Sequence, residues 1–243
     1  MADPTRIFVT GASRGLGLEF TRQFAARGDR VFATCREPNV AKDLQKLAHD
    51  HKDHVSIVGL DVGDAHSIET AHKAVAAHVD GLDLLINNAG VYAARVGRGG
   101  QPAEKLGELK FDEALYVLRT NAVAPLIIAQ QFLDLLSRGR NAKVVNITSG
   151  YGSVSGNTGG FPYYYAASKA ALNMFMRSFA ADGESRGITT IVMNPGWVRT
   201  DMGTSAAPLA PEQSVGGMIR VIDRLTAKDN NRFLNWQGKE EAW

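Results

Sequence analysis

RIFVTGASRGLG, residues 6–17, sets the architecture that the rest of the chain follows. The β-branched and aromatic run RIFVT predicts a buried strand, and an apolar helical pattern begins at Leu16. The turn between them has glycines in the spacing GxxxGxG rather than GxGxxG. Glycine lets the backbone turn tightly and approach a pyrophosphate, while a helix N-terminus presents unpaired N–H groups and partial positive charge. The segment therefore predicts a dinucleotide site.

Short β-branched runs alternate with longer amphipathic stretches along the rest of the chain. The predicted strands are 6–10, 30–34, 55–60, 82–87, 143–148 and 188–193, with 232–236 as a further edge strand. The predicted helices are 16–27, 40–50, 67–79, 111–137, 164–185 and 211–225. Several strands are apolar throughout, which is typical of a parallel sheet covered on both faces. We expect a single α/β domain over residues 1–243, a Rossmann-type doubly wound parallel sheet with helices on both faces.

Composition excludes several classes of function. The chain has 243 residues, of which 44% are hydrophobic and 21% charged, with a formal net charge of +2. This balance, without a Lys/Arg block, argues against a nucleic-acid partner. A signal peptide and a membrane-spanning apolar run are both missing from the sequence, so we expect no membrane partner and a cytoplasmic location. Cys35 is the single cysteine, which excludes an internal disulfide and a multi-cysteine metal site, and we expect no metal.

The residues after the second predicted strand indicate which nicotinamide cofactor binds. An acidic residue there would bond the ribose 2'-hydroxyl and repel a 2'-phosphate. The sequence has Thr34-Cys35-Arg36 instead, and Arg36 offers a charge-assisted fork to phosphate. Arg14, inside the glycine turn, is a second candidate for the same anion. Either arginine alone could equally be a solvated surface residue. Together they favour NADP(H) over NAD.

FPYYYAASKAAL, residues 161–172, contains a candidate pair for proton transfer. Tyr165 and Lys169 lie four residues apart in an Ala-rich run, so they share one face of a helix. The pKa of tyrosine is about 10, and a close ammonium group would lower it toward neutral pH. Such pairs also occur on solvated helix faces. Tyr163 and Tyr164 lack a lysine four residues later, and we expect them to have packing roles.

In this order, the motifs resemble the short-chain dehydrogenase/reductase family over essentially the whole chain. The matches are the glycine motif at 10–17, Asn87-Asn88-Ala89-Gly90, Asn121, Ser149, the Tyr165/Lys169 pair and Asn194-Pro195-Gly196. Within the family the chain looks most like the C-factor and sniffer-type carbonyl reductases, through FATCREP at 32–38, GNTGGFPYYYAASKAALNM at 156–174, VRTDMG at 198–203 and Trp243. The resemblance implies an NADPH-dependent carbonyl reductase whose small-molecule substrate is a ketone, aldehyde or quinone.

The resemblance also implies catalytic roles. Tyr165 would donate a proton to the carbonyl oxygen, Lys169 would lower the pKa of Tyr165 and bind the nicotinamide ribose, and Ser149 would bond the substrate oxygen. Asn121 would hold a water that links Lys169 to solvent, or would instead bond the backbone at a helix kink. Ser149 precedes Tyr165 by more residues than is usual in the family. Two later serines are therefore its rivals: Ser153 and Ser155.

Further matches concern the cofactor. Asp61 would bond the adenine amino group, with Val62 beside it, although Asp61 could instead cap the following helix. Val198 and Thr200 would hold the nicotinamide carboxamide. The full set expected at the cofactor is Gly11, Ser13, Arg14, Gly15, Leu16, Gly17, Arg36, Asp61, Val62, Asn88, Ala89, Gly90, Tyr165, Lys169, Pro195, Gly196, Val198 and Thr200.

Three expectations concern substrate access, assembly and function. The segment TDMGTSAAPLAP, residues 200–211, is shorter than the substrate lid of many family members. We therefore expect an open site contacted by Tyr151, Trp197 and the loop of residues 91–100. The helices at 111–137 and 164–185 would pair in a homodimer or homotetramer, as is typical of the family. The alternative function is a dinucleotide-binding signalling or regulatory protein, a role attached to some C-factor relatives.

Overall fold

A computed structural model of the chain describes residues 3–92, 104–160 and 162–243. Within these ranges, seven parallel strands form one sheet in the order β3-β2-β1-β4-β5-β6-β7. The strands are β1 (Arg6–Val9), β2 (Arg30–Cys35), β3 (Val55–Gly59), β4 (Leu84–Asn87), β5 (Lys143–Ile147), β6 (Thr189–Asn194) and β7 (Arg232–Asn235). The chain winds from β1 outward to β3, then returns to β4 beside β1 and winds the other way. This confirms the predicted doubly wound parallel sheet and its added edge strand.

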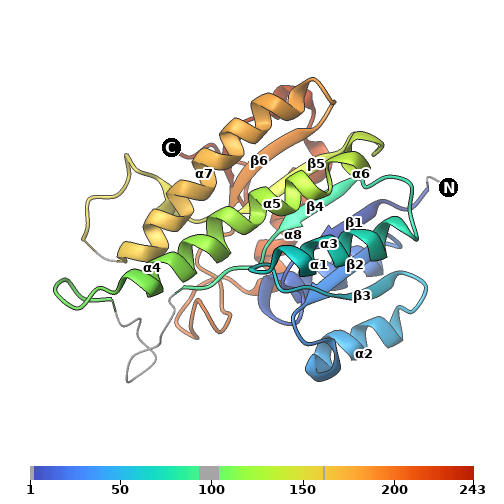
Figure 1. Cartoon of the computed structure of the whole chain (residues 1–243), viewed down its shortest axis with the longest axis horizontal. Helices are drawn as coiled ribbons and strands as arrows, with labels where there is room; N and C mark the ends of the chain where they lie inside the picture. Colours follow the sequence, from blue (N-terminus) through green and yellow to red (C-terminus); the bar gives the residue numbers. More distant parts are fainter. Residues whose placement is uncertain (1–2, 93–103, 161) are drawn as a thin grey trace.

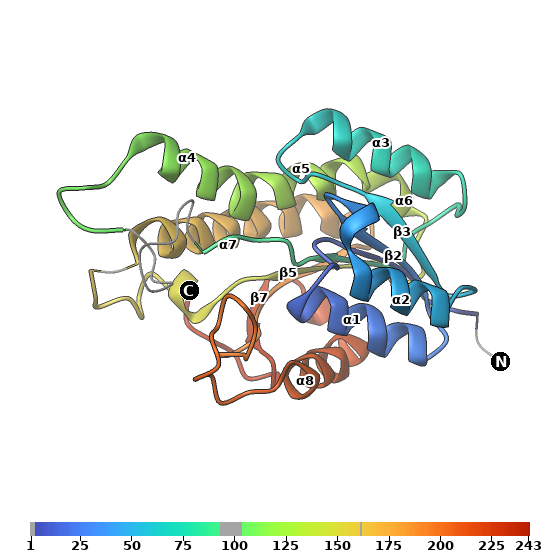
Figure 2. The ribbon, with the colours of Figure 1, turned by 90° about the horizontal axis from the view of Figure 1, so that it is seen from below.

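Helices cover both faces of the sheet and make a three-layered molecule (Figure 1 and Figure 2). One face carries α1 (Gly15–Ala26), α2 (Lys42–Asp50) and α8 (Pro211–Arg224). The other carries α3 (Ala65–Ala76), α4 (Phe111–Leu118), α5 (Ala124–Gln131), α6 (Leu133–Ser137) and α7 (Tyr163–Glu184). Successive residues of β1 enter opposite cores: Ile7 and Val9 pack toward α1, and Phe8 packs toward Phe132. Burial on both faces explains why the strands are apolar throughout.

The helix predicted over 111–137 is interrupted. α4 ends at Leu118, a π-helical turn spans Arg119–Val123, and α5 and α6 are separated at Phe132. Within the turn the Thr120 hydroxyl donates to the carbonyl of Tyr116 at 2.9 Å, and Pro125 has no N–H to continue the regular pattern. The wide turn brings the side chain of Asn121 to the loop that follows β4.

Other predicted boundaries shift by a few residues for local reasons. α3 begins at Ala65 because the carboxylate of Asp64 accepts the N–H of His66 at 3.0 Å. Asp61, the alternative cap, accepts the N–H of Gly63 at 2.9 Å in the preceding turn, so that alternative is wrong. The stretch predicted to start at residue 40 begins as the 3-10 turn Pro38–Val40, and α2 follows from Lys42.

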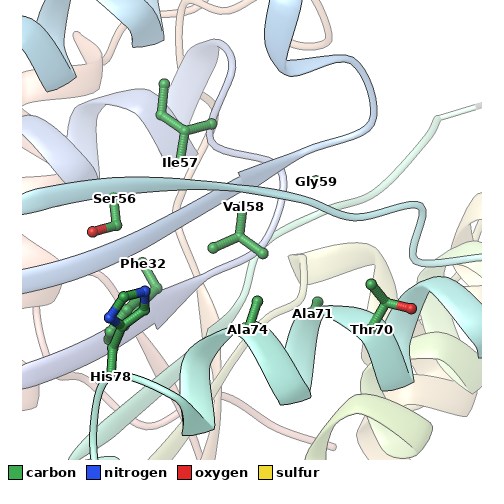
Figure 3. A pocket seen from close by; sticks show the side chains of 9 residues that line it. All are labelled: Phe32, Ser56, Ile57, Val58, Gly59, Thr70, Ala71, Ala74 and His78. Atoms are coloured by element: carbon green, nitrogen blue, oxygen red, sulfur yellow. The ribbon is translucent and has the colours of Figure 1, made fainter.

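The carboxyl ends of the parallel strands meet at one edge of the sheet. The chain reverses its winding between β1 and β4, and such a switch point is where open α/β sheets bind ligands. A separate hollow of about 330 Å³ lies between β3 and α3, where β3 has no further strand beside it (Figure 3). Its lining is Phe32, Ser56, Ile57, Val58, Gly59, Thr70, Ala71, Ala74 and His78. None of the predicted site residues lines this hollow.

Candidate active site

The glycine turn between β1 and α1 is a cradle that side chains would fill. Gly11 has a φ of +68°, and a Cβ on it would lie 2.9 Å from the Cα of Ala89. A Cβ on Gly17 would lie 2.3 Å from the carbonyl oxygen of Gly11. Arg14, the N-cap residue of α1, gives that helix no side-chain hydrogen bond. The turn thus leaves backbone N–H groups at the start of α1 for an anion, which fits a pyrophosphate.

Thr10 and Asn88 hold the glycine turn against the loop after β4. The hydroxyl of Thr10 accepts the N–H groups of Asn88 and Ala89, both at 2.9 Å. The amide of Asn88 donates to the carbonyls of Thr10 at 2.8 Å and Gly11 at 3.2 Å. The side chain of Asn88, predicted at the cofactor, is therefore used to shape the cradle. Thr10 takes part in this contact although the glycine spacing alone did not indicate it.

Of the other residues predicted in the turn, some lie in the cradle and some pack in the core. Ser13 is half-buried in the turn, and Leu16 packs against the core under α1. Gly15 has a φ of +56°, and a Cβ on it would lie 3.5 Å from Cγ2 of Thr200. The turn therefore faces the segment after β6, which contains Val198 and Thr200.

The two candidate phosphate-binding arginines lie in different surroundings. Arg36 is exposed directly after β2, and this strand end abuts the glycine turn because the N–H of Ala12 donates to Thr34 at 2.7 Å. Arg14 forms an ion pair with Asp201 at 3.1 Å, and both side chains are exposed. Exposed ion pairs contribute only about 0–1 kcal/mol, so Arg14 can exchange this partner for a phosphate. Arg14 thus lies in the turn, and Arg36 follows the strand end that contacts it.

The predicted adenine contacts follow β3. Asp61 is exposed, and its N–H donates to the hydroxyl of Ser67 at 2.9 Å. Val62 is half-buried against the core under α3. The structure therefore places Asp61 at the carboxyl end of its strand, in the same row of strand ends as the glycine turn.

Tyr165 and Lys169 lie on one face of the first turns of α7. Their side chains are buried, and Nζ of Lys169 is 5.6 Å from the centre of the Tyr165 ring. This ammonium donates to the carbonyl of Ile147, at the end of β5, at 2.8 Å. A Cβ on Gly90 would lie 3.7 Å from Nζ, so the loop after β4 reaches the same point. The ammonium of Lys169 and the ring of Tyr165 therefore lie close together, as their spacing of four residues in a helix predicts.

Burial controls the titration of this pair. It raises the pKa of Tyr165 to about 12, a rise that a hydrogen bond with Ser149 opposes and that Tyr92 and Tyr151 reinforce. Burial also lowers the pKa of Lys169 to about 8. The expected lowering of the Tyr165 pKa by Lys169 is therefore not found. The cost of placing a charge in this buried position exceeds any gain from the neighbouring ammonium.

Ser149 and its two rivals have different partners. Ser149 follows β5 and forms a hydrogen bond with Tyr165. Its oxygen also accepts the N–H of Tyr151 at 3.2 Å. The hydroxyls of Ser153 and Ser155 lie 3.4 Å and 2.7 Å from the carbonyl oxygen of Trp243, to which they donate. Of the three serines, the structure brings Ser149 to the phenol.

Asn121 is fully buried and bonds the backbone. Its amide donates to the carbonyl of Val91 at 2.7 Å and to Ser168 at 3.0 Å, and its oxygen accepts the N–H of Val91 at 2.8 Å. This is the arrangement that the helix-kink alternative predicts. A Cβ on Gly90 would lie 3.3 Å from its oxygen, so Asn121 lies close to the chain beside Lys169.

Aromatic rings surround the phenol. The ring of Tyr92 is 4.7 Å from that of Tyr165, and the ring of Tyr151 meets it edge-on at 6.3 Å. Tyr151 and Trp197 are 49% and 56% exposed, so they remain accessible to a bound molecule. The sequence did not predict Tyr92 at the site. Its position shortly after Asn88-Ala89-Gly90 could have indicated it. Residues 93–100 of the expected substrate loop lie outside the described ranges.

The other two tyrosines of the cluster have structural partners. The N–H of Tyr164 donates to Glu104 at 2.9 Å, and its hydroxyl donates to the carbonyl of Lys110 at 3.1 Å. Tyr163 is half-buried and lies near Gly160. The packing roles predicted for Tyr163 and Tyr164 fit these contacts.

The segment after β6 forms a compact bend beside the glycine turn. Gly196 has a φ of +80°, and a Cβ on it would lie 2.6 Å from Leu209. Its neighbour Pro195 accepts a hydrogen bond from Ser214 at 2.6 Å. Val198 pairs with Leu209, and the hydroxyl of Thr200 accepts the N–H of Gly203 at 3.2 Å. The bend brings Thr200 beside Gly15 of the glycine turn, and the contact of Val198 and Thr200 with the nicotinamide stays a prediction.

The described residues contain neither a membrane-spanning helix nor a metal-binding cluster. Among them, no helix is long and apolar enough to cross a membrane. In the same ranges, no cluster of three or more His, Cys, Asp or Glu residues is arranged to hold a metal ion.

Known proteins resemble this chain in sequence and in structure. The family model for short chain dehydrogenase matches residues 5–209. The C-signal protein of Myxococcus xanthus is 40% identical over 162 residues, which cover 67% of this chain and 93% of that protein. The NADPH-bound carbonyl reductase from chicken fatty liver has a TM-score of 0.90 and 37% identity, with 100% of both chains covered. The carbonyl reductase Sniffer of D. melanogaster has a TM-score of 0.87 and 32% identity, with 99% of this chain and 100% of that chain covered. The likeness extends over the whole sheet.

Proposed function

We propose, since the chain belongs to the short chain dehydrogenases and is an oxidoreductase, that it is an NADPH-dependent carbonyl reductase. The observation that carries this proposal is the contact between Ser149 and a buried phenol, Tyr165, beside a buried Lys169. NADPH, when bound, supplies the hydride that reduces a ketone, aldehyde or quinone carbon. The protein must then hold the carbonyl oxygen and supply a proton to it.

Tyr165 is the proton donor in this proposal. With a pKa of about 12, its phenol is protonated throughout the neutral range, so the proton stays on the oxygen until a stronger base appears. The alkoxide that develops at the carbonyl oxygen during reduction is such a base. Ser149 donates a second hydrogen bond to the same oxygen, because its hydroxyl already lies at the phenol.

Lys169 returns the proton to Tyr165. A pKa of about 8 lets its ammonium lose and regain a proton near neutral pH, which an ordinary lysine does not. Its Nζ also lies beside Gly90, where it can bind the ribose hydroxyls of the nicotinamide. Asn121 holds the backbone of Val91 next to this point, and we keep for it the role of supporting a water between Lys169 and solvent.

NADP(H) is the cofactor that fits the site. The glycine cradle of Gly11 and Gly17 accepts the pyrophosphate, and Arg36 beside it offers a cation for the 2'-phosphate. The chicken and Pseudomonas aeruginosa carbonyl reductases were solved with NADPH and NADP bound. The cofactor contacts proposed for the chain are those predicted from its motifs.

The substrate proposal is a carbonyl compound of varied size. Tyr151 is exposed beside Tyr165, Trp197 is exposed on the bend after β6, and apolar ring faces accept flat or bulky molecules. We therefore expect activity on several ketones, aldehydes and quinones rather than on one small substrate. A panel assay with NADPH and NADH measures this breadth, and strict selectivity for one small carbonyl would contradict it.

Replacing Tyr165 by phenylalanine tests the catalytic proposal. The Tyr165→Phe variant removes the proton and keeps the ring, so we expect kcat to fall about 1,000-fold while the Kd for NADPH stays unchanged. Tyr163→Phe is the matched control, and its kcat should stay at the parent value. The measurements are NADPH oxidation and fluorescence titration of the cofactor. Substantial turnover in Tyr165→Phe would contradict the assigned donor.

Reversing the charge at Arg36 tests the cofactor proposal. An aspartate there repels a 2'-phosphate and bonds a 2'-hydroxyl, so Arg36→Asp should shift the ratio of kcat/KM for NADPH over NADH toward NADH by about 100-fold. Arg186→Asp, an exposed site in the turn after α7, is the matched control. An unchanged cofactor ratio in Arg36→Asp would refute the assigned role.

The second candidate is a dinucleotide-binding signalling protein, and the identity to the C-signal protein favours considering it. Both candidates need the glycine cradle, but only a reductase needs Ser149, Tyr165 and Lys169 together. Their arrangement favours the reductase. A parent protein that binds NADPH and turns over no carbonyl in the panel would support the signalling protein instead.

Location and assembly stay predictions. We expect a cytoplasmic protein that pairs through the helices of the α4–α5 region and α7. Exposed apolar side chains on these helices, Phe111, Leu115 and Met174, agree with such pairing. Sedimentation would give the oligomeric state.

A further inference from the structure

The chain folds back after β7 and returns to the catalytic edge. A turn at Asn235–Lys239 reverses its direction, since the N–H of Asn235 donates to Lys239 at 2.8 Å. Leu234 and Glu240 then form an antiparallel bridge, and the N–H of Glu241 donates to Phe233 at 2.8 Å. Figure 2 shows the end of this segment, marked C, next to the yellow turn that follows β5. Residues 240–243 therefore lie beside the loop that begins at Ser149.

Trp243 binds the far part of that loop. Its carbonyl oxygen accepts the N–H of Ser155 at 3.2 Å and the hydroxyl of Ser155 at 2.7 Å, with the hydroxyl of Ser153 at 3.4 Å. Its indole packs against Phe233 with ring centres 5.6 Å apart, and the guanidinium of Arg177 lies 4.3 Å from the indole centre. The ring is thus anchored on β7 and α7, while the carbonyl holds the loop.

Glu241 binds the other side of the catalytic edge. Both of its carboxylate oxygens accept the amide of Asn194, at 2.9 Å and 3.0 Å. The oxygen of Asn194 in turn accepts the N–H of Gly196 at 3.0 Å, and a Cβ on Gly150 would lie 3.4 Å from its nitrogen. One short segment therefore connects the loop after β5 with the bend after β6.

The near part of the loop after β5 is held by different residues. The hydroxyl of Thr148 donates to Asn173 at 2.7 Å, and the amide of Asn173 donates to the carbonyl of Gly152 at 3.1 Å. Beyond Gly152, the described contacts that tie the loop to other elements are those with Trp243. Glycine at 150, 152 and 156 leaves the loop backbone with many accessible conformations. An outside anchor is what restricts it.

We propose that Trp243 is a positioning residue for catalysis, which fixes residues 149–156 so that Ser149 and Tyr151 keep their places at Tyr165. Glu241 supports it by fixing the direction of the same segment. The proposal rests on the proposed reductase function. It goes beyond that function because Trp243 and Glu241 touch neither the phenol nor the glycine cradle in the described contacts. In this proposal, the segment after β7 helps to fix the positions of the side chains that hold the substrate.

Hydrogen–deuterium exchange and kinetics of Trp243→Ala, Trp243→Phe and Ser155→Ala test this proposal. Trp243→Ala removes the anchor, so amide exchange in residues 150–156 should rise about tenfold. With a carbonyl substrate, kcat should fall about tenfold while the Kd for NADPH changes less than twofold. Trp243→Phe keeps a ring on Phe233 and Arg177 and should recover most of both losses. Ser155→Ala keeps the anchor and removes one bond to it, and should give an intermediate effect.

Matched controls separate positioning from general damage. Ser178→Ala removes an exposed hydroxyl of α7 that bonds the helix's own carbonyl, and it should change neither exchange nor kcat. Parent-like exchange in residues 150–156 of Trp243→Ala would overturn the proposal, as would equal losses of kcat and NADPH binding. If Trp243→Ala does not fold, Ser155→Ala decides by the same measurements. Exchange needs no substrate, so it shows whether Trp243 fixes the loop even if the parent turns over no carbonyl, an outcome that would refute the proposed function.

Discussion

The two edges of the sheet treat buried charge in opposite ways. At the amino edge, Asp83 before β4 lies between Arg6 of β1 and Arg140 before β5, with contacts of 2.8 Å and 3.0 Å. At the carboxyl edge, Lys169 is equally buried, and its described hydrogen-bond partner is a neutral carbonyl. Two arginines compensate the charge of Asp83, whereas no described carboxylate compensates that of Lys169.

The pKa values report this difference. Burial alone would raise the pKa of Asp83, but hydrogen bonds from Arg6 and Arg140 outweigh it and bring the pKa far below its usual range. Burial lowers the pKa of Lys169 to about 8, against an unfolded value of about 10.4. Asp83 therefore favours the folded state at neutral pH. The ammonium of Lys169 opposes it by about 3 kcal/mol, because each pKa unit corresponds to about 1.4 kcal/mol.

The charges at the two edges therefore have different effects. A compensated charge fixes strand ends and does nothing else, whereas an uncompensated one keeps a pKa near neutral and can exchange protons. The carboxyl edge, where we propose the active site, therefore costs stability that the amino edge supplies. A variant that removes Lys169 should lose activity and gain stability, whereas one that removes Asp83 should lose stability and keep its activity.

Lys169→Met should give the largest effect. Without the ammonium the proton on Tyr165 is not returned, so we expect kcat to fall about 1,000-fold. The same change removes the cost of burying a charge, so the free energy of unfolding should rise by about 2 kcal/mol. Below about pH 8 the cost is fully present, and above about pH 10 it is absent, so this gain should vanish in alkaline solution. Enzyme assays and urea unfolding at pH 7 and pH 10.5 measure both.

Lys143→Met is the matched control for that prediction. Lys143 begins β5 at the amino edge, donates to the carbonyl of Ile222 at 2.9 Å, and has a pKa lowered by burial. Its replacement should stabilise the protein slightly and leave kcat unchanged. If Lys169→Met destabilises the protein, the assigned cost of its charge is wrong.

Asp83→Asn should give the next largest effect, in the opposite sense. It leaves Arg6 and Arg140 without their shared carboxylate, so we expect the free energy of unfolding to fall by about 3 kcal/mol with kcat unchanged. Because the folded-state pKa of Asp83 is lowered, its contribution is present above about pH 4 and is lost as the pH falls toward the folded value. The difference between parent and variant should therefore shrink between about pH 4 and pH 2. Chemical unfolding across this range measures it.

Asp80→Asn is the control for the amino edge. Asp80 also pairs with Arg6, at 2.6 Å, but its side chain is 94% exposed. Exposed pairs contribute less than about 1 kcal/mol, so this variant should unfold almost as the parent does. If Asp80→Asn and Asp83→Asn lower the free energy of unfolding equally, burial is not the reason why Asp83 binds its two arginines strongly.

Local sequence patterns were sufficient to predict the strands of the sheet and to select the motif residues as candidates. Apolar runs predicted the strands, because a strand buried on both faces has no polar side. The spacing of Tyr165 and Lys169 predicted a shared face, because helical geometry depends only on neighbours. The π turn at Asn121 interrupts a pattern that reads as one helix, because its cause is a contact with Val91 in another part of the chain.

By itself the sequence determined the doubly wound sheet, the glycine turn at its switch point and the identity of Ser149, Tyr165 and Lys169 as candidates. The sheet, the turn and the shared helix face of Tyr165 and Lys169 follow from periodicity, spacing and turn chemistry, which act over a few residues, whereas Ser149 was implied by the family resemblance. Tertiary structure alone decided that burial raises the pKa of Tyr165 and lowers that of Lys169. It also decided that Trp243 returns to the loop after β5. Burial and long-range contacts depend on how segments far apart in the sequence pack together, and a local sequence pattern does not specify that packing.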